Sequence, residues 1–297
     1  MKKEIDKREN IRVVTSNEFI LAEGLSDLSL NARKMLYLAL SQCKKGDPEF
    51  YEYEITPTEL AEIWGISRQR VYQQADEITD ELMRLVIKVC EKTGKRFKKR
   101  HVFFTCDYDD DSKLTFMLHK DMTDMLLGVD KNFSKPLLWD FMRMRSPYSM
   151  AIWHLMQREM RSFKPMMSRP IEFDLTLDEL RQVTRTQGKF ERLSQFKERV
   201  LDKAIREIRE NCLVNISYAY IKRGRTVTGF RFTAENYFGT IKPEELTLRE
   251  RQRMRKAQLI HKKAMGVLSP DEILELEYLQ SDLYQMTIED VLNNYPD

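Results

Sequence analysis

The side chains best suited to recognise another molecule gather at two places where helices are expected to begin. In the first half of the chain they are Ser67, Arg68, Gln69, Arg70 and Gln73, and in the second half they are Ser194, Gln195, Lys197, Arg199, Lys203 and Arg206. In the major groove of DNA, arginine and lysine donate to guanine O6 and N7, and glutamine pairs with adenine N6 and N7. The chemistry indicated is the reading of base edges by two helices, although an ordinary solvated helix face remains an alternative for any single cation.

Positive charge is concentrated rather than spread over the chain. The segment 181–231 holds thirteen basic and five acidic side chains, a net charge of +8, whereas the whole chain of 297 residues has a net charge of only +3. Two further clusters lie where β-hairpins are expected, with Lys98 and Lys99 in 95-KRFKKR-100 and with Arg223 and Arg225 in the second half. Localised cations neutralise phosphates and release counterions, so these segments are expected to bind nucleic acid.

Catalytic and metal-binding patterns are missing from the sequence. None of the histidines (His101, His119, His154 and His261) pairs with another at the spacing of a zinc site or of a paired-histidine nicking site. The four cysteines form no CxxC pair, and no GxxxxGK[ST] phosphate loop occurs. Tyr148 could be proposed as a DNA nucleophile, but no metal site supports it. The chain is therefore expected to be a binding protein, not an enzyme, without metal or other cofactor.

The elements that must position these side chains occur twice. The stretch 51-YEYEITPTELAEI-63 is matched by 171-IEFDLTLDELRQV-183 at a constant offset of 120 residues. Each copy is preceded by an expected helix, at 29–44 with Ser29 as its N-cap and at 146–160. Each copy is followed by an amphipathic helix, which begins at Ser67 in the first half and spans 194–210 in the second.

A β-hairpin is expected after each of these helices. In the first half the strands are VIKVC and HVFFTC around a turn at Thr93-Gly94, followed by the strand KLTFML. In the second half LVNISYAYIKRGRTVTGFRF turns at Arg223-Gly224. The order helix, strand, helix-turn-helix and hairpin is that of a winged helix. The first hairpin, with Val102 on its surface, also offers apolar strands that could join a second copy of the chain.

These features predict an α+β protein of two tandem winged-helix domains that arose by divergent internal duplication, plus a C-terminal helical tail. The expected ranges are 1–142 for the N-terminal winged-helix domain, 143–240 for the C-terminal winged-helix domain, and 241–297 for the charged helical tail. The tail has seven basic residues and one acid in 249–263, and seven acids and no base in 271–290. It could pair with itself as a helical hairpin, stay mobile, or dock on another protein.

In this order the segments resemble the iteron-binding plasmid replication initiators of the Rep_3 family. The resemblance covers roughly residues 13–238 and rests on NEFILAEGLSDLSLNARKMLYLAL, ITPTELAEIWGIS, VYQQADEITDELM and SPYSMAIWHLMQ, and above all on LSQFKERVLDKAIREI followed by GRTVTGFRF. It implies two winged-helix domains that bind directly repeated origin sequences, promote opening of adjacent AT-rich DNA and recruit host replication proteins. The resemblance also implies that the second domain (143–240) is the main DNA-reading domain, and that the first (1–142) provides dimerisation and auxiliary DNA binding.

The partners implied are double-stranded origin DNA, a second copy of the chain, and the host initiator protein and replicative helicase. The free protein is expected to be a dimer and the DNA-bound form a monomer. No apolar run is long enough for a membrane span and the first residues do not resemble a signal peptide, so a bacterial cytoplasmic location is expected. The alternative function is a winged-helix transcriptional repressor acting at its own or another promoter.

Overall fold

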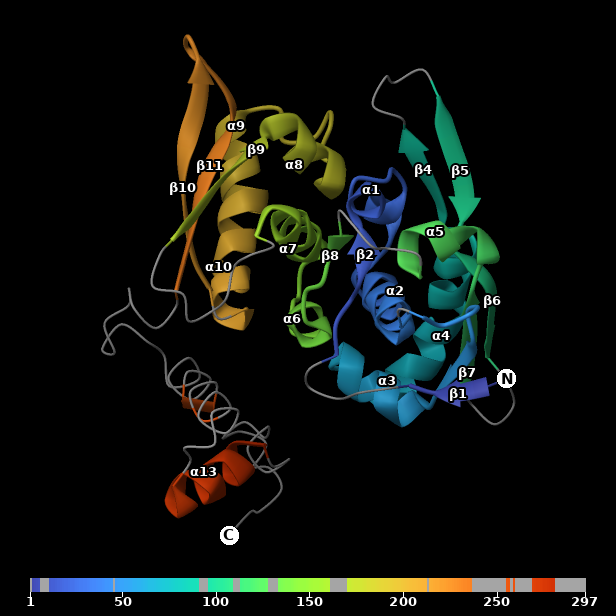
Figure 1. Ribbon diagram of the computed structural model, residues 1–297. Helices are drawn as coiled ribbons and strands as arrows, with labels where there is room; N and C mark the ends of the chain where they lie inside the picture. The colour runs from blue at the N-terminus through green and yellow to red at the C-terminus, as the bar shows by residue number, and fades with distance from the viewer. Residues whose placement is uncertain are drawn as a thin grey trace.

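Each half of the chain folds into a helix-turn-helix followed by a two-stranded wing (Figure 1). The computed structural model describes residues 2–5, 11–44, 46–90, 96–108, 113–127, 133–160, 170–212, 214–236, 255–256, 259 and 269–280. Within these ranges, no helix is both long and apolar enough to cross a bilayer. The expected turns at Thr93-Gly94 and at Asp109 to Asp111 lie outside the described residues.

The first unit begins with short elements around a buried helix. These are β1 (Lys2–Glu4), β2 (Thr15–Ser16), α1 (Asn17–Ile20), the 3-10 turn η1 (Leu25–Asp27) and α2 (Leu30–Gln42). The expected N-cap is confirmed, because the Ser29 hydroxyl accepts from the Ala32 N–H. The helix-turn-helix follows as α3 (Pro57–Trp64) and α4 (Arg68–Met83). Gly65 ends α3 in a left-handed conformation that favours glycine, with φ of 69°.

The first unit has three separate sheets among its described residues, the smallest being the pair of Thr15–Ser16 with Phe133–Ser134. Strands β1, β3 (Glu52–Ile55), β7 (Leu114–Leu118) and β6 (Phe103–Tyr108) form one sheet in the order β1-β3-β7-β6. The wing is a second sheet of β4 (Val86–Cys90) and β5 (Phe97–His101), which pair antiparallel. The unit ends with the 3-10 turn η2 (Lys120–Met122), α5 (Thr123–Leu126), β8 (Phe133–Ser134) and α6 (Leu138–Met142).

The composition of the first wing corrects the sequence analysis. The second wing strand is FKKRH, not HVFFTC, and the strand within HVFFTC is β6, which pairs with β7 in the other sheet. Val102 lies between β5 and β6 and is fully buried, so it is not on the hairpin surface. The basic run therefore forms a wing strand, and KLTFML does form a strand as expected.

The second unit repeats the arrangement with one sheet. It contains α7 (Pro147–Glu159), β9 (Ile171–Thr176), α8 (Leu177–Thr184), α9 (Leu193–Phe196), the π-helical segment η3 (Lys197–Leu201), α10 (Asp202–Asn211), β10 (Val214–Arg223) and β11 (Thr226–Asn236). The strand order is β10-β11-β9. Gly229 is required where β11 passes β9, because a Cβ there would lie 2.5 Å from the Leu175 carbonyl oxygen.

The internal repeat is confirmed in atomic detail. The Thr56 side chain accepts from the Glu59 N–H while the Glu59 carboxylate accepts from the Thr56 N–H, and Thr176 and Glu179 form the same capping box 120 residues later. Trp64 and Trp153 are buried and belong to the apolar core. The copies differ in that β9 joins its wing sheet, whereas β3 joins β7 and leaves β4–β5 as a separate ribbon.

The two units share one continuous apolar core. Helix α7 lies in the middle of the molecule, where it contacts α8 and α10 on one side and α1 and β8 on the other (Figure 1). Polar contacts add to this packing, since Gln182 Nε2 donates to the Leu21 carbonyl oxygen at 2.8 Å and Arg185 pairs with Asp27. The helix-turn-helix of one unit is therefore held at a set position relative to that of the other.

The described part of the tail is small. Helix α13 (Pro270–Gln280) places Leu276 and Leu279 against Leu259 in a separate apolar cluster. Arg255, from the basic part of the tail, pairs with Glu275 and Glu272. These contacts favour the self-pairing alternative for the described residues of the tail.

Candidate nucleic-acid interface

The first reading helix, α4, presents its polar residues at its N-terminal end. Its core face is Val71, Ala75, Ile78 and Leu82, and the sequence-predicted side chains on the outer face are exposed: Arg68, Gln69, Arg70 and Gln73. Arg68 donates to the Tyr72 hydroxyl at 2.9 and 3.1 Å, which holds its guanidinium along the helix. A cleft of about 730 Å³ between α3 and α4 is lined by both Arg68 and Arg70.

The first wing is anchored at its base and basic along its outer strand. Lys98 and Lys99 are exposed on β5 opposite Val89 and Lys88. Arg100, next in the same strand, pairs with Asp124 of α5 and donates to the Asp121 carbonyl oxygen. The Arg100 guanidinium lowers the pKa of the Asp124 carboxyl below its ordinary value. Arg100 therefore stabilises the fold by joining β5 to α5 and η2. Lys98 and Lys99 remain the exposed lysines of this strand.

The inner strand of the first wing is attached to the segment before η1. Glu23 and Lys88 exchange two backbone hydrogen bonds of 3.0 and 2.9 Å, and the Lys88 ammonium also lies 3.0 Å from the Glu23 carboxylate. Gly24 makes this approach possible, because its φ is +107° and a Cβ there would lie 2.4 Å from the Val86 carbonyl oxygen. The base of the wing is thus fixed to the segment that also contacts α8.

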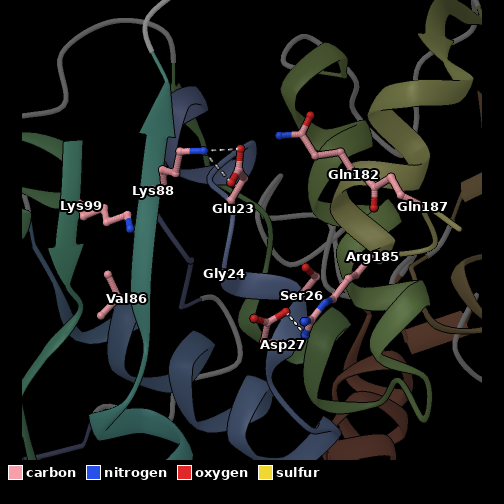
Figure 2. A pocket seen from close by; sticks show the side chains of 10 residues that line it. All are labelled: Glu23, Gly24, Ser26, Asp27, Val86, Lys88, Lys99, Gln182, Arg185 and Gln187. Atoms are coloured by element: carbon pink, nitrogen blue, oxygen red, sulfur yellow. Dashed lines mark hydrogen bonds and ion pairs between the residues drawn. The ribbon is translucent and has the colours of Figure 1, made fainter. Parts of the chain in front are cut away.

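A cleft of about 480 Å³ separates the first wing from α8 (Figure 2). Lys88 and Lys99 point into it from the wing, and Gln182, Arg185 and Gln187 reach it from the second unit (Figure 2). Glu23 pairs with Lys88 and Asp27 with Arg185, so both carboxylates of the cleft neutralise a cation. The cleft is an ion-paired junction that fixes the spacing of the two helix-turn-helix motifs.

Arg181 organises the turn between α8 and the second reading helix. Its guanidinium donates to the carbonyl oxygens of Thr186, Lys189, Phe190 and Glu191 at 3.0, 2.9, 3.0 and 3.4 Å. The guanidinium also lies over the Phe196 ring, 4.8 Å from its centroid. Arg181 thus ties the turn to the first residues of the reading helix.

The second reading helix is continuous from Leu193 to Asn211 but is not regular, which differs from the uniform helix expected over 194–210. Residues Lys197–Leu201 are π-helical, and the Asp202 N–H donates to the Lys197 carbonyl oxygen five residues before it. The sequence-predicted residues Ser194, Gln195, Arg199, Lys203 and Arg206 are exposed, whereas Lys197 is half-buried.

The second wing reaches the end of the molecule where the reading helix begins (Figure 1). Its strands meet at the expected turn, with Arg223 ending β10 and Arg225 exposed after Gly224. Lys197 lies over two tyrosine rings of β10, 5.7 Å from the Tyr218 centroid and 5.2 Å from the Tyr220 centroid. The Tyr218 hydroxyl donates to the Asp202 carboxylate, and burial raises the pKa of Tyr218 to about 12.

The structure reduces the charge available to phosphates. The Arg181 guanidinium is engaged in hydrogen bonds to the carbonyl oxygens of its turn. Arg231 donates to both oxygens of Asp174 at 2.8 and 2.9 Å. These two arginines belong to the fold, although both contribute to the +8 charge of 181–231. The predicted wing and helix cations other than Lys197 are exposed: Arg68, Arg70, Lys98, Lys99, Arg199, Lys203, Arg206, Arg223 and Arg225.

The sequence analysis did not identify the residues that position the candidate DNA-binding side chains. Arg181, Tyr218 and Tyr220 contact backbone carbonyls or neighbouring side chains within the second unit. The alternation of tyrosines with lysine in SYAYIK is a signal that could have indicated a half-exposed aromatic strand face beside the reading helix.

Groups suited to metal-assisted cleavage are not gathered in the part of the chain that the structure describes, where no three His, Cys, Asp or Glu residues converge. His154 is buried, His101 is exposed on β5, and the His119 side chain accepts from the Asp121 N–H. His261 lies outside the described residues. Tyr148 is half-buried and packs against the apolar core.

We therefore predict that the purified protein does not nick supercoiled plasmid that carries the DNA flanking its gene, with Mg²⁺ or Mn²⁺ present. Tyr148→Phe is expected to retain full origin activity, because the ring packing stays and only the hydroxyl is lost. Agarose gels of the incubated plasmid and transformation frequencies measure the two results. Open-circular product that depends on wild-type protein and is lost in Tyr148→Phe contradicts the prediction.

Comparison with known proteins bears on the family and the fold. Residues 12–157 match the family model described as "Initiator Replication protein, WH1", and residues 176–234 match "Initiator Rep protein, WH2". The fold is similar to a solved structure described as the crystal structure of Pi initiator protein in complex with iteron DNA. The TM-score is 0.67 at 19% identity, and the match covers 77% of this chain and 98% of that one.

A second solved structure, selenomethionine-containing domains 2 and 3 of RctB, matches with a TM-score of 0.32 at 12% identity, over 74% of this chain and 81% of that one. The two family models occur in tandem and together span most of the chain, and the first extends to residue 157, so that it includes most of α7. The predicted fold of two tandem winged-helix domains is thereby confirmed, and the chain belongs to the Rep_3 family of replication initiator proteins.

Proposed function

We propose that this protein initiates plasmid replication by binding directly repeated origin sequences as a monomer, with one reading helix of each domain in the DNA. The observation that carries the proposal is that two reading helices with exposed polar ends and two basic wings belong to one body with a shared core. Both wings project toward the same side of the molecule in Figure 1. The Pi initiator, whose fold is similar, was crystallised with iteron DNA.

The domains have different roles in this proposal. Residues 143–240 dominate base reading because their reading helix and wing carry more exposed cations, including Arg199, Lys203, Arg206, Arg223 and Arg225. Residues 1–142 assist through Arg68, Gln69, Arg70 and Gln73, and they also provide the dimer surface. Bound protomers promote opening of adjacent AT-rich DNA and recruit the host initiator protein and replicative helicase, without an enzymatic step of their own.

Binding is tested with a duplex that carries one direct repeat from the DNA flanking the gene, against a scrambled duplex of the same composition. Fluorescence anisotropy over a series of salt concentrations gives affinity and salt slope, and sedimentation gives stoichiometry. One protein per repeat, and at least about 1000-fold preference over scrambled DNA, are expected of specific binding. Equal affinity for both duplexes would refute the proposal.

Two substitutions separate base reading from phosphate binding. Arg199→Ala is expected to lower affinity for the repeat by about 1–3 kcal/mol more than affinity for scrambled DNA, because a bidentate base contact is lost. Arg223→Ala is expected to weaken both duplexes alike and to reduce the salt slope by about 0.9, because one phosphate contact is lost. The anisotropy titrations measure both. If Arg199→Ala weakens the two duplexes equally, Arg199 contacts phosphate instead of a base.

The dimer surface is proposed to be the outer edge of the four-stranded sheet. Strand β6 is the last strand in that sheet among the described residues, and Phe104 on it is 57% exposed. An exposed strand edge with an apolar side chain can pair with its own copy about a two-fold axis. A dimer would prefer inverted half-sites, so the same protein could repress its own gene, which is the alternative function.

Phe104→Glu is expected to shift the free protein from dimer to monomer while one monomer still binds each repeat. Phe97→Glu is the matched control, because Phe97 is also 57% exposed but lies on the wing. Val102 cannot serve in this test, since a charge at a fully buried position would unfold the protein. Analytical ultracentrifugation with and without DNA measures the result. Two wild-type chains on every single repeat would contradict the model.

A further inference from the structure

We infer that the cleft between the first wing and α8 binds one phosphodiester of the DNA duplex, and that Arg185 is the residue of the second domain that contacts it. The inference rests on the proposed function and deepens it, because it adds a backbone contact between the sites read by the two domains. It also gives a function to an arginine in a strained conformation.

The first observation is the backbone conformation of Arg185. This residue ends α8 with φ of 50° and ψ of 47°, in the left-handed region that residues with a Cβ rarely adopt. In the first copy, Gly65 ends α3 with φ of 69° and ψ of 39°. The two positions are 120 residues apart, which is the offset of the internal repeat. One position of the repeated motif is therefore glycine in one copy and arginine in the other.

The hydrogen bonds of the turn do not require an arginine. The Ile66 N–H donates to the Ala61 carbonyl oxygen at 3.1 Å, and in the equivalent turn the Thr186 N–H donates to the Arg181 carbonyl oxygen at 3.0 Å. Both turns are thus closed in the same way, and glycine suffices in the first copy. Because a residue with a Cβ is strained at this position, the Arg185 side chain is expected to have a function that offsets the strain.

The ion pair with Asp27 does not account for the strained arginine. The Arg185 and Asp27 side chains are 61% and 50% exposed, so water and salt screen the pair. Exposed pairs of this kind contribute less to stability than left-handed strain costs. The shared apolar core already joins the two units. The guanidinium is therefore expected to bind a molecule outside the chain.

The cleft that Arg185 lines has the charge of an anion-binding site. Its lining includes three cations, Lys88, Lys99 and Arg185, and two carboxylates, Glu23 and Asp27, which give a net charge of +1. Glu23 pairs with Lys88 and Asp27 with Arg185, whereas Lys99 has no carboxylate partner within the described ranges. A phosphodiester carries one negative charge, so it would neutralise the cleft.

The position of the cleft identifies the anion as part of the DNA. Lys99 reaches the cleft from the first wing and Arg185 reaches it from the opposite wall (Figure 2). That wall is the helix-turn-helix of the second domain, whose reading helix begins at Leu193. A duplex that contacts both the wing and this helix-turn-helix must pass the cleft between them. Arginine and lysine are typical donors to its phosphate oxygens.

Three variants separate DNA binding from stability. Arg185→Gly and Arg185→Ala both remove the guanidinium, so both are expected to weaken binding to the repeat about tenfold, as for the loss of one charge-assisted hydrogen bond. Only glycine relieves the strain, so Arg185→Gly is expected to unfold at a temperature no lower than wild type and above Arg185→Ala. Asp27→Asn keeps the guanidinium and removes a negative charge, so it is expected to bind at least as tightly as wild type.

The decisive measurement places one neutral methylphosphonate at each backbone position of the repeat in turn. For wild type, we expect about a tenfold loss of affinity at a position between the two sites read by the domains. In Arg185→Gly the same substitution is expected to have no further effect. Lys189→Ala, which removes an exposed cation of the same turn outside the cleft lining, is the control and should retain the full loss.

The outcomes distinguish this inference from the proposed function. If wild type does not prefer the repeat to scrambled DNA, the proposed function fails. If it does, but the methylphosphonate profiles of wild type and Arg185→Gly are the same, the cleft does not hold a backbone phosphate. Equal weakening by Asp27→Asn and Arg185→Gly also overturns the inference, because the ion pair within the protein is then what supports binding.

Discussion

Replacing Arg181 with alanine is expected to weaken binding to the direct repeat roughly 100-fold, although Arg181 need not touch DNA. A hydrogen bond from a charged donor contributes about 1.5–3 kcal/mol and a 100-fold change corresponds to about 2.7 kcal/mol, so the net loss of one or two such bonds accounts for it. Arg181 donates to four carbonyl oxygens of the turn that leads into the reading helix. Without it, the turn no longer holds the helix in place.

The Arg181 prediction is checked by anisotropy together with thermal unfolding. Arg181→Lys keeps the charge but cannot reach four acceptors, so it is expected to bind almost as weakly as Arg181→Ala. Lys189→Ala is the control, because it removes an exposed cation from the same turn and leaves the backbone acceptors in place. Recovery of wild-type affinity in Arg181→Lys would show that charge, not geometry, is what Arg181 supplies.

The second large effect is expected at acid pH and comes from His154. This histidine is fully enclosed between the two domains, with Nε2 2.9 Å from the Thr15 hydroxyl and Nδ1 3.1 Å from the Tyr37 hydroxyl. Burial and the nearby Arg33 cation lower the pKa of His154 to about 3. Because Arg33 donates to the Tyr37 oxygen, the Tyr37 hydroxyl is oriented to donate to Nδ1, which must stay unprotonated.

The direction of the pH effect follows from this lowered pKa. The unfolded chain binds a proton on His154 below pH 6.5, whereas the folded chain does so only near pH 3, so stability is complete above 6.5 and falls between these values. Between pH 7 and pH 5 the loss is about 2 kcal/mol. Chemical denaturation at the two pH values, with His154→Gln as the non-titrating control, measures it. Equal losses in wild type and variant would exclude His154 as the source.

The repeated framework could be read from the sequence because it depends on local chemistry. Thr56 with Glu59 and Thr176 with Glu179 are capping pairs whose spacing is visible in the chain, and both form as expected. The second wing was also predictable, since its tyrosines and phenylalanines alternate and its turn contains Gly224.

The first wing was not predictable for a physical reason. Strand β5 is FKKRH and is largely exposed, so it has no apolar alternation to reveal it. The neighbouring FFTC has the stronger β-forming composition, but it is held by β7, a partner that only the folded chain brings to it. Arg181 was equally hidden, because its acceptors are backbone carbonyls, which every residue has.

Helix α7 also bears on how such a protein can evolve. Copies of a duplicated domain can be recombined between relatives when each keeps a core of its own. Here every residue from Ser149 to Met156 is buried, and the faces of that one helix belong to different copies. The two domains are therefore expected to be inherited together. A chimera that takes one half from a distant relative has mismatched packing against α7, whether the junction is placed before or after that helix.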